Sequence, residues 1–138
     1  MVTEMIAAIY VDDLTASRNF YRELLGLQPI FEAEWICQLS SPSNESLKLI
    51  LQPREHELIP KAFQERPKGT SIAFIVPDSD EIYQRAVAMG LEIIQEPRNE
   101  EYGRRRFLTV DPDRLLVDVS SDCEPSPDFV AKYMNFEE

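Results

Sequence analysis

The stretch YGRRRFLTVDPDRLLVDV, residues 102–119, predicts two strands joined by a tight turn. The strands are expected at residues 104–110 and 115–120, and the Asp-Pro-Asp segment between them has residue types that favour turns. Asp118 alternates with two valines on the second strand, so its side chain faces the other side of the sheet from theirs. Three interpretations of Asp118 are open: a ligand of a metal centre, the remnant of a lost centre, or an ordinary acid on the wall of a cleft.

The segments around this hairpin occur in the same order twice. Each copy begins with a short apolar strand, continues with an amphipathic helix and ends with three strands. The first copy is expected to have a strand at 5–11, a helix capped by Asp13 and ended by Gly26, and strands at 28–34, 35–40 and 47–52. The second is expected to have a strand at 70–76, a helix at 77–91 capped by Asp78 or Ser79, and strands at 91–96, 104–110 and 115–120. YVDD at 10–13 corresponds to IVPD at 75–78, and LGL at 25–27 corresponds to MGL at 89–91.

This duplication predicts the fold class α+β, with two tandem βαβββ modules that form a curved mixed sheet around a cleft. The modules are expected at about residues 4–52 and 70–120, with a linker at 53–69. They are interpreted as one domain, residues 1–122, followed by a C-terminal tail at 123–138 with a short helix at 128–135.

The composition restricts the classes of partner and the location. The chain has 138 residues, with 14 Lys and Arg against 25 Asp and Glu, so its net charge is −11. Such a chain repels phosphate backbones, which makes nucleic acid an unsuitable partner, whereas a cationic ligand suits it; solubility alone also explains the charge. Cys37 and Cys123 form no CxxC pattern, and no signal peptide or membrane span is recognised. We therefore expect free thiols, no membrane partner and a cytoplasmic location.

Two motifs resemble those of one family. VDDLTASRNFYRELLGL at 11–27 and the stretch at 102–119 are similar to the opening and closing signatures of the vicinal oxygen chelate superfamily, the glyoxalase, bleomycin-resistance and dioxygenase group. The resemblance covers about residues 4–120 and implies the duplicated βαβββ fold and a homodimer. Arg114 stands where this family usually has glycine, and because arginine tolerates a positive φ poorly, we expect a different turn geometry there.

The resemblance also implies four metal-ligand positions, two in each module. They correspond to Ile6, Ile50, Ser71 and Asp118, and only Asp118 is a strong donor. Because a stable divalent site normally needs three protein donors, neither a metal nor another cofactor is expected. The single histidine, His56, lies in the linker, so no Ser-His-Asp or Cys-His set can be assembled and no catalytic residue is assigned.

Strand alternation predicts which side chains line the cleft and which pack under the helices. The cleft-lining positions, led by the four mapped ones, are Ile6, Ala8, Tyr10, Lys48, Ile50, Gln52, Ser71, Ala73, Ile75, Leu116, Asp118 and Ser120. Leu47, Leu49 and Leu51 are expected under the first helix. The predicted ligand-binding residues combine polar lining positions with aromatic and basic residues near the rim: Tyr10, Trp35, Lys48, Ser71, Tyr102, Arg105 and Asp118. For Asp118 the alternatives are water, an arginine of 104–106, Lys48, or a ligand group.

The leading functional hypothesis is a metal-free small-molecule binding protein, similar to bleomycin-resistance proteins, that sequesters a drug or metabolite without chemistry. A cationic or aromatic ligand would suit the negative charge. The alternative is a metal-dependent lyase, isomerase or dioxygenase, which the isoleucines at the ligand positions argue against. A third hypothesis is a partner-binding or regulatory domain with no small ligand.

Overall fold

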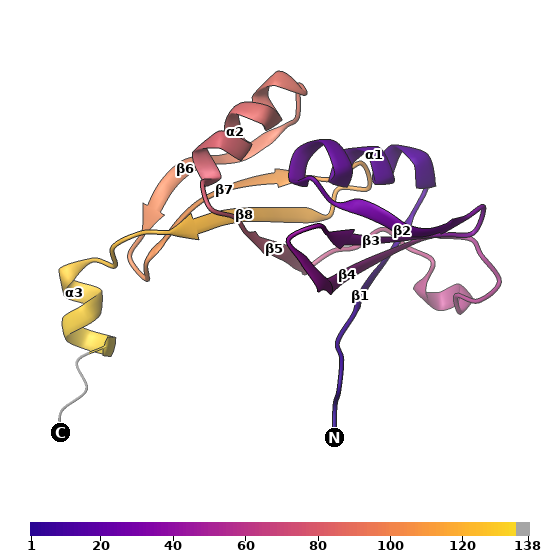
Figure 1. Ribbon diagram of the computed structural model, residues 1–138, viewed down its shortest axis with the longest axis horizontal. Coiled ribbons are helices and arrows are strands. Elements are labelled where there is room, and N and C mark those ends of the chain that lie inside the picture. Colours follow the sequence, from indigo (N-terminus) through magenta and orange to yellow (C-terminus); the bar gives the residue numbers. More distant parts are fainter. Residues whose placement is uncertain (135–138) are drawn as a thin grey trace. The chain divides into compact units, whose positions relative to one another are not determined.

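The computed structural model describes residues 1–134 and contains two four-stranded sheets, each with a helix on one side (Figure 1). The first module comprises β1 (Ala7–Val11), α1 (Leu14–Leu25), β2 (Gln28–Ala33), β3 (Ile36–Ser41) and β4 (Asn44–Pro53). The second comprises β5 (Ser71–Ile75), α2 (Ser79–Ala88), β6 (Ile93–Glu100), β7 (Arg104–Val110) and β8 (Leu116–Asp122). The strand orders are β1-β4-β3-β2 and β5-β8-β7-β6, with one parallel pair in each sheet. The predicted α+β fold of two tandem βαβββ modules is confirmed.

The chain divides into two compact units, which are described separately below. One contains Met1–Gly69 together with Asp111–Leu115, and the other contains Thr70–Val110 and the chain from Leu116 on. The turn between β7 and β8 therefore packs with the first unit although its strands belong to the second. The predicted domain boundary at residue 122 stays a prediction.

The helix termini agree with their predicted caps. Asp13 accepts a hydrogen bond from the amide of Ala16, and Gly26 ends α1 with a left-handed φ of 71°. Asp78 accepts from the first-turn amides of α2. Each helix buries one side against its own sheet: α1 buries Ser17, Phe20, Tyr21 and Leu24, and α2 buries Ser79, Ile82 and Ala86.

The alternation predicted for β4 holds for two of its three leucines. Leu49 and Leu51 are buried in the core of the first module. Leu47 is 38% exposed, so its predicted packing under the helix is wrong. β4 is also longer than expected, since it begins at Asn44 after a turn of only two residues. Leu47 lies towards this turn, and alternation gives the side of a sheet on which a residue lies but not how far the helix covers it.

Strand β6 also extends further than predicted. The strand was predicted to end at residue 96, and the next residue, Pro97, cannot donate a hydrogen bond in a sheet. The register between β6 and β7 is irregular between Ile93 and Gln95 and again between Gln95 and Arg98. These bulges accommodate the proline, and the strand continues to Glu100.

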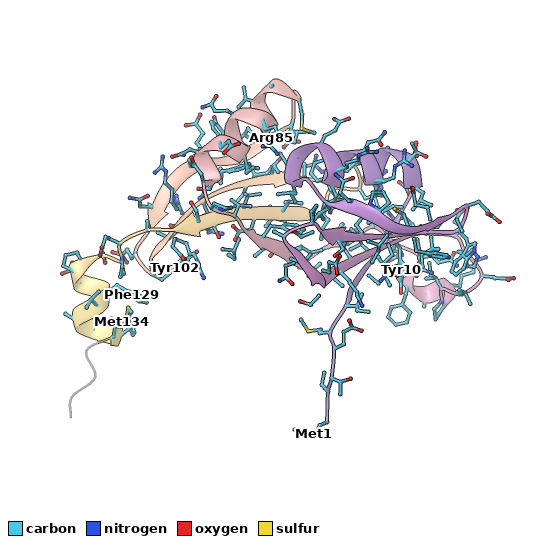
Figure 2. The ribbon with its side chains drawn as sticks, in the orientation of Figure 1. Met1, Tyr10, Arg85, Tyr102, Phe129 and Met134 are labelled. Atoms are coloured by element: carbon cyan, nitrogen blue, oxygen red, sulfur yellow. The ribbon has the colours of Figure 1, made fainter. Side chains whose placement is uncertain are left out.

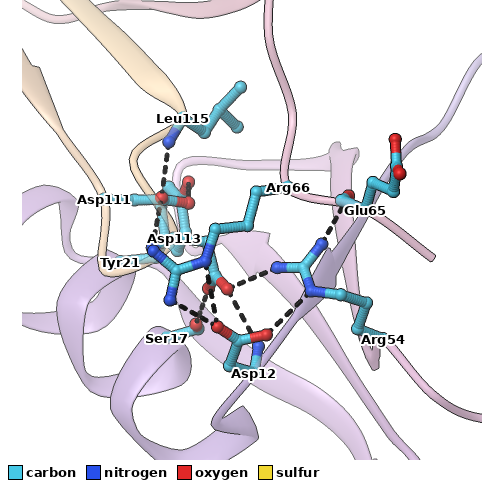
Figure 3. Close-up of polar contacts among 9 residues, drawn as sticks. All are labelled: Asp12, Ser17, Tyr21, Arg54, Glu65, Arg66, Asp111, Asp113 and Leu115. Atoms are coloured by element: carbon cyan, nitrogen blue, oxygen red, sulfur yellow. Dashed lines mark hydrogen bonds and ion pairs between the residues drawn. The ribbon is translucent and has the colours of Figure 1, made fainter.

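The Asp-Pro-Asp turn is held by buried hydrogen bonds (Figure 3). Asp111 accepts from the Tyr21 hydroxyl at 2.8 Å and from the amides of Asp113 and Leu115, each at 2.9 Å. Burial raises the pKa of Asp111, and burial beside this carboxylate raises that of Tyr21. Arg114 has a φ of 66°, so the expectation that it would avoid a positive φ is wrong. The contacts of Asp111 over-determine the turn and hold Arg114 in a conformation that glycine would adopt at less cost.

The tail contains the expected helical segment, beginning one residue earlier. It consists of α3 (Pro127–Phe129), capped by Ser126, and a π-helical segment, η2 (Val130–Met134). The predicted helix end at residue 135 lies outside the described residues. Both cysteines are free thiols, and no helix in residues 1–134 is long and apolar enough to cross a membrane.

Candidate functional site

A row of four side chains crosses the second sheet on the side away from α2. Asp118 on β8 pairs with Leu108 on β7 and with Ala73 on β5, and Leu108 also pairs with Gln95 on β6. Residues paired across strands project to the same side of a sheet. Val117 and Val119, the neighbours of Asp118 in the chain, are fully buried on the α2 side. We call Gln95, Leu108, Asp118 and Ala73 the Asp118 row.

Arg106 connects this row to a second carboxylate. Its NH1 donates to Asp118 Oδ2 at 2.9 Å, and its Nε donates to Glu100 Oε2 at 2.6 Å. The three side chains are only 23%, 18% and 13% exposed, so the pairs are shielded from solvent. Arg106 holds the pKa of Glu100 below its ordinary value, and hydrogen bonds to Glu100 and Asp118 raise the pKa of Arg106 against the effect of burial. Arg106 is therefore fixed between two carboxylates.

Two buried polar atoms in the Asp118 row have no hydrogen-bond partner within residues 1–134. They are Asp118 Oδ1 and Gln95 Nε2, an acceptor and a donor. Gln95 and Asp118 lie two strands apart, which places them about 10 Å from each other, with Leu108 between them. A buried polar group without a partner costs about 1–3 kcal/mol of stability, so both atoms need an explanation.

The other site residues predicted in the second module are divided between the two sides of its sheet. Ser71 is exposed and pairs with Leu116, which shares the side of Asp118. Tyr102 is 49% exposed in the turn between β6 and β7, close enough to influence the pKa of Arg106 (Figure 2). Arg105 lies on the α2 side, where its Nε donates to the carboxylate of Asp80 at 3.0 Å.

The sequence named an arginine of 104–106 as one possible partner of Asp118, and this alternative is confirmed by the ion pair with Arg106. The arginine expected at the site was Arg105, which occupies the motif position, but the arginine that meets Asp118 is its neighbour. One signal would have found it: Phe107 is apolar and belongs with the core, so residues 106 and 108 must project to the opposite side.

The predicted site residues of the first module lie on or beside its sheet. Tyr10 pairs with Gln52 on the side away from α1, and Figure 2 shows it on β1. Lys48 donates to Glu4 at 2.8 Å. Trp35 stacks on His56, with ring centroids 5.6 Å apart and planes inclined by 27°. Of these three residues, Lys48 alone is charged, and its ion pair with Glu4 is separate from the network of Arg54, Asp12 and Arg66.

The sequence matches a known protein family over most of its length. The model of the Glyoxalase/Bleomycin resistance protein/Dioxygenase superfamily matches residues 5–119. The chain belongs to this superfamily. Within it, the sequence matches no curated protein at a significant level.

Several solved structures share the fold at low sequence identity. A glyoxalase-related enzyme from Fulvimarina pelagi is 23% identical, with a TM-score of 0.74 over 88% of this chain and 89% of that one. An integron cassette protein from the mobile metagenome of V. Cholerae is also 23% identical, with a TM-score of 0.70 over 88% and 95%. A lactoylglutathione lyase from Agrobacterium tumefaciens is 22% identical, with a TM-score of 0.67 over 86% and 92%. At these identities the likeness concerns the fold alone.

The superfamily fold implies a divalent metal, and the residues at the mapped positions do not fit one. Ile6 and Ile50 have no donor atom, and Ser71 carries only a neutral hydroxyl. Asp118 uses one carboxylate oxygen for Arg106. In neither unit, over residues 1–134, do three His, Cys, Asp or Glu side chains come close enough to hold an ion. The mapped positions therefore supply one strong donor where a stable divalent site normally needs three.

Proposed function

We propose that this protein binds a small molecule without a metal and without chemistry, as a bleomycin-resistance-like member of its superfamily. The observation that supports this proposal is the pair of unpartnered buried atoms, Asp118 Oδ1 and Gln95 Nε2. A ligand that supplies a donor to the first and an acceptor to the second would remove the cost of burying both.

The surroundings indicate the chemistry of the ligand. Leu108 and Ala73 provide apolar surface within the Asp118 row, which suits a flat or aliphatic body with one polar group at each end. Arg98 also pairs with Glu100, at 3.2 Å, so two guanidiniums face the two carboxylates and the preference beside Asp118 comes from its unpartnered oxygen. That oxygen is an acceptor, so an ammonium or amide N–H is the preferred ligand group there.

The proposal excludes catalysis because the row lacks the groups for it. No histidine or cysteine is part of the Asp118 row, so a nucleophile and base pair cannot be assigned to it. Asp118 is held by Arg106 at one oxygen, an arrangement that suits fixed hydrogen bonding more than proton transfer. A cytoplasmic location is part of the proposal, and the two free cysteines agree with it.

A thermal-shift screen with cationic and aromatic compounds, glycopeptide drugs and divalent metal salts tests the proposal. We expect stabilisation by one class of organic compound and none by metals. Asp118→Asn should weaken binding of that compound by at least about tenfold, the equivalent of one charged hydrogen bond. Asp122→Asn is the matched control, since Asp122 lies on the same strand with its side chain 83% exposed, and it should leave the affinity unchanged.

Elemental analysis of the purified protein separates this proposal from the metal-dependent alternative. A transition metal at about one equivalent per chain, removed by Asp118→Asn, would overturn the proposal and favour a lyase, isomerase or dioxygenase. Equal affinity of the Asp118→Asn and Asp122→Asn variants for the organic compound would place its site elsewhere and refute the assignment to the Asp118 row.

A further inference from the structure

The first compact unit has an open surface hollow, and Figure 3 shows four of its lining residues: Asp12, Arg54, Glu65 and Arg66. Its volume is about 670 Å³, and it is lined by Asp12, Arg54, Gln64, Glu65, Arg66 and Lys68. We call it the Arg66 hollow. Three of its six lining residues are cationic and two, Asp12 and Glu65, are acidic, a formal balance of 3 − 2 = +1 in a chain whose net charge is −11. The hollow therefore departs from the charge balance of the protein as a whole.

Arg54 forms the rigid base of the hollow. Its side chain is 8% exposed, and all three of its nitrogens have partners. Nε donates to Asp12 Oδ1 at 2.7 Å, NH2 to Asp113 Oδ1 at 2.5 Å, and NH1 to the carbonyl of Glu65 at 2.6 Å. The last contact fixes the backbone of the segment that carries Arg66 and Lys68. Arg54 is thus a positioning residue: three of its five N–H groups are used within the protein, and its side chain is almost fully buried.

Arg66 and Lys68 have unused hydrogen-bonding capacity. Arg66 is 55% exposed and directs Nε and NH2 at Asp12 Oδ2, at 3.2 and 2.7 Å. No hydrogen bond to its NH1, and no carboxylate within ion-pair distance of Lys68, occurs in the part of the chain that the structure describes. Two cationic groups with free donors therefore lie on one wall of the same hollow.

We propose that the Arg66 hollow binds a phosphate group, free or on a small molecule, between Arg66 and Lys68. A guanidinium presents paired N–H groups that match two oxygens of such an anion, and an ammonium adds a point charge. Asp12 faces the same space and weakens binding, because its carboxylate repels the anion and already occupies two donors of Arg66. All the residues of this site belong to the first compact unit, Met1–Gly69 with Asp111–Leu115, so it is independent of the function proposed for the Asp118 row.

The test is a titration with inorganic phosphate, followed by calorimetry and by amide chemical shifts, at ionic strength held constant with chloride. Wild type should bind saturably, with shifts centred on residues 64–68. Arg66→Gln and Lys68→Gln should each weaken binding at least about tenfold, since each removes a charged donor. Lys61→Gln is the matched control: Lys61 is exposed in the same connecting segment, does not line the hollow, and should leave binding unchanged.

Asp12→Asn makes the sharpest prediction because it should strengthen binding. Removal of one negative charge about 6 Å from the anion, in a partly solvated site, corresponds to roughly a tenfold gain in affinity. The same series with glycerol 3-phosphate assigns the ligand: tighter binding of the ester indicates a phosphorylated small molecule, and equal binding indicates free phosphate. Adventitious binding of equal strength in wild type, Arg66→Gln and Lys68→Gln would overturn the proposal, as would no binding by wild type and Asp12→Asn.

Discussion

Replacing Arg54 by methionine should destabilise the protein far more than the same change at Arg66. Arg54 is the partner of Asp113, whose side chain is 3% exposed and whose Oδ1 accepts from Arg54 NH2. Methionine keeps the apolar stem of Arg54 but leaves that carboxylate buried without its counter-charge. Removing one partner from a buried ion pair costs about 3–5 kcal/mol. Asp113 keeps two hydrogen bonds, from the amide of Asp12 at 2.9 Å and from the Ser17 hydroxyl at 3.5 Å, so the lower end, about 3 kcal/mol, is expected.

Urea denaturation followed by circular dichroism measures this cost. With an m-value of about 1.5 kcal/mol/M, a loss of about 3 kcal/mol moves the midpoint down by about 2 M. Arg66→Met is the control, because Arg66 is 55% exposed and exposed ion pairs contribute little. A second substitution, Asp113→Asn, should restore part of the stability in the Arg54→Met background, since it removes the unpaired charge. If Arg54→Met and Arg66→Met shifted the midpoint equally, the buried pair would not be stabilising the turn as inferred.

Three further predictions concern titration, thiol reactivity and assembly. Arg106 lowers the pKa of Glu100 in the folded state. The stability that this pair contributes is therefore present above the unfolded pKa of Glu100, about 4.3, and is lost as pH falls through the folded pKa. Urea midpoints measured from pH 7 to pH 3 should fall less steeply for Arg106→Gln than for wild type. Burial raises the pKa of Cys37 to about 11, so a thiol reagent at pH 8 should modify Cys123 first and Cys37 only after unfolding, and equal rates in the native protein would contradict its burial. The homodimer implied by the family resemblance predicts a light-scattering mass of about twice 15.9 kDa, and a mass equal to that of one chain would refute it.

The fold could be predicted from the sequence because helix caps and helix ends depend on the chemistry of single residues. Asp13 and Asp78 precede helices as residues that accept first-turn N–H groups, and Gly26 ends a helix because it tolerates a left-handed φ. The duplicated order of strands and helices then leaves few ways to arrange each sheet. The errors fell where a neighbouring strand overrides local preference: β6 continues through Pro97 because bulges opposite β7 absorb the missing donor.

The site was less readable because it depends on the phase of alternation and on long-range pairs. Asp118 faces away from α2, as alternation predicted, but Arg105 was chosen over Arg106 because the motif position was given more weight than the alternation set by the buried Phe107. Arg54 was assigned to a linker, and nothing local to it indicates a partner 59 residues away in the β7–β8 turn. Gln95 carries no motif, and only the register of β6 against β7 brings it into the row of Asp118.

The two polar clusters differ in how completely their buried polar atoms are paired. In the Asp-Pro-Asp turn each carboxylate of Asp111 and Asp113 has charged, hydroxyl or amide partners, and the turn is held in place even though Arg114 occupies a positive φ. In the Asp118 row one acceptor and one donor remain buried and unpaired, at a cost of about 1–3 kcal/mol each. Apolar residues of similar size at those two positions would avoid that cost. A folded chain that carries this cost is less stable than it need be, and such a cost is expected where a protein binds a ligand, as we propose for the Asp118 row.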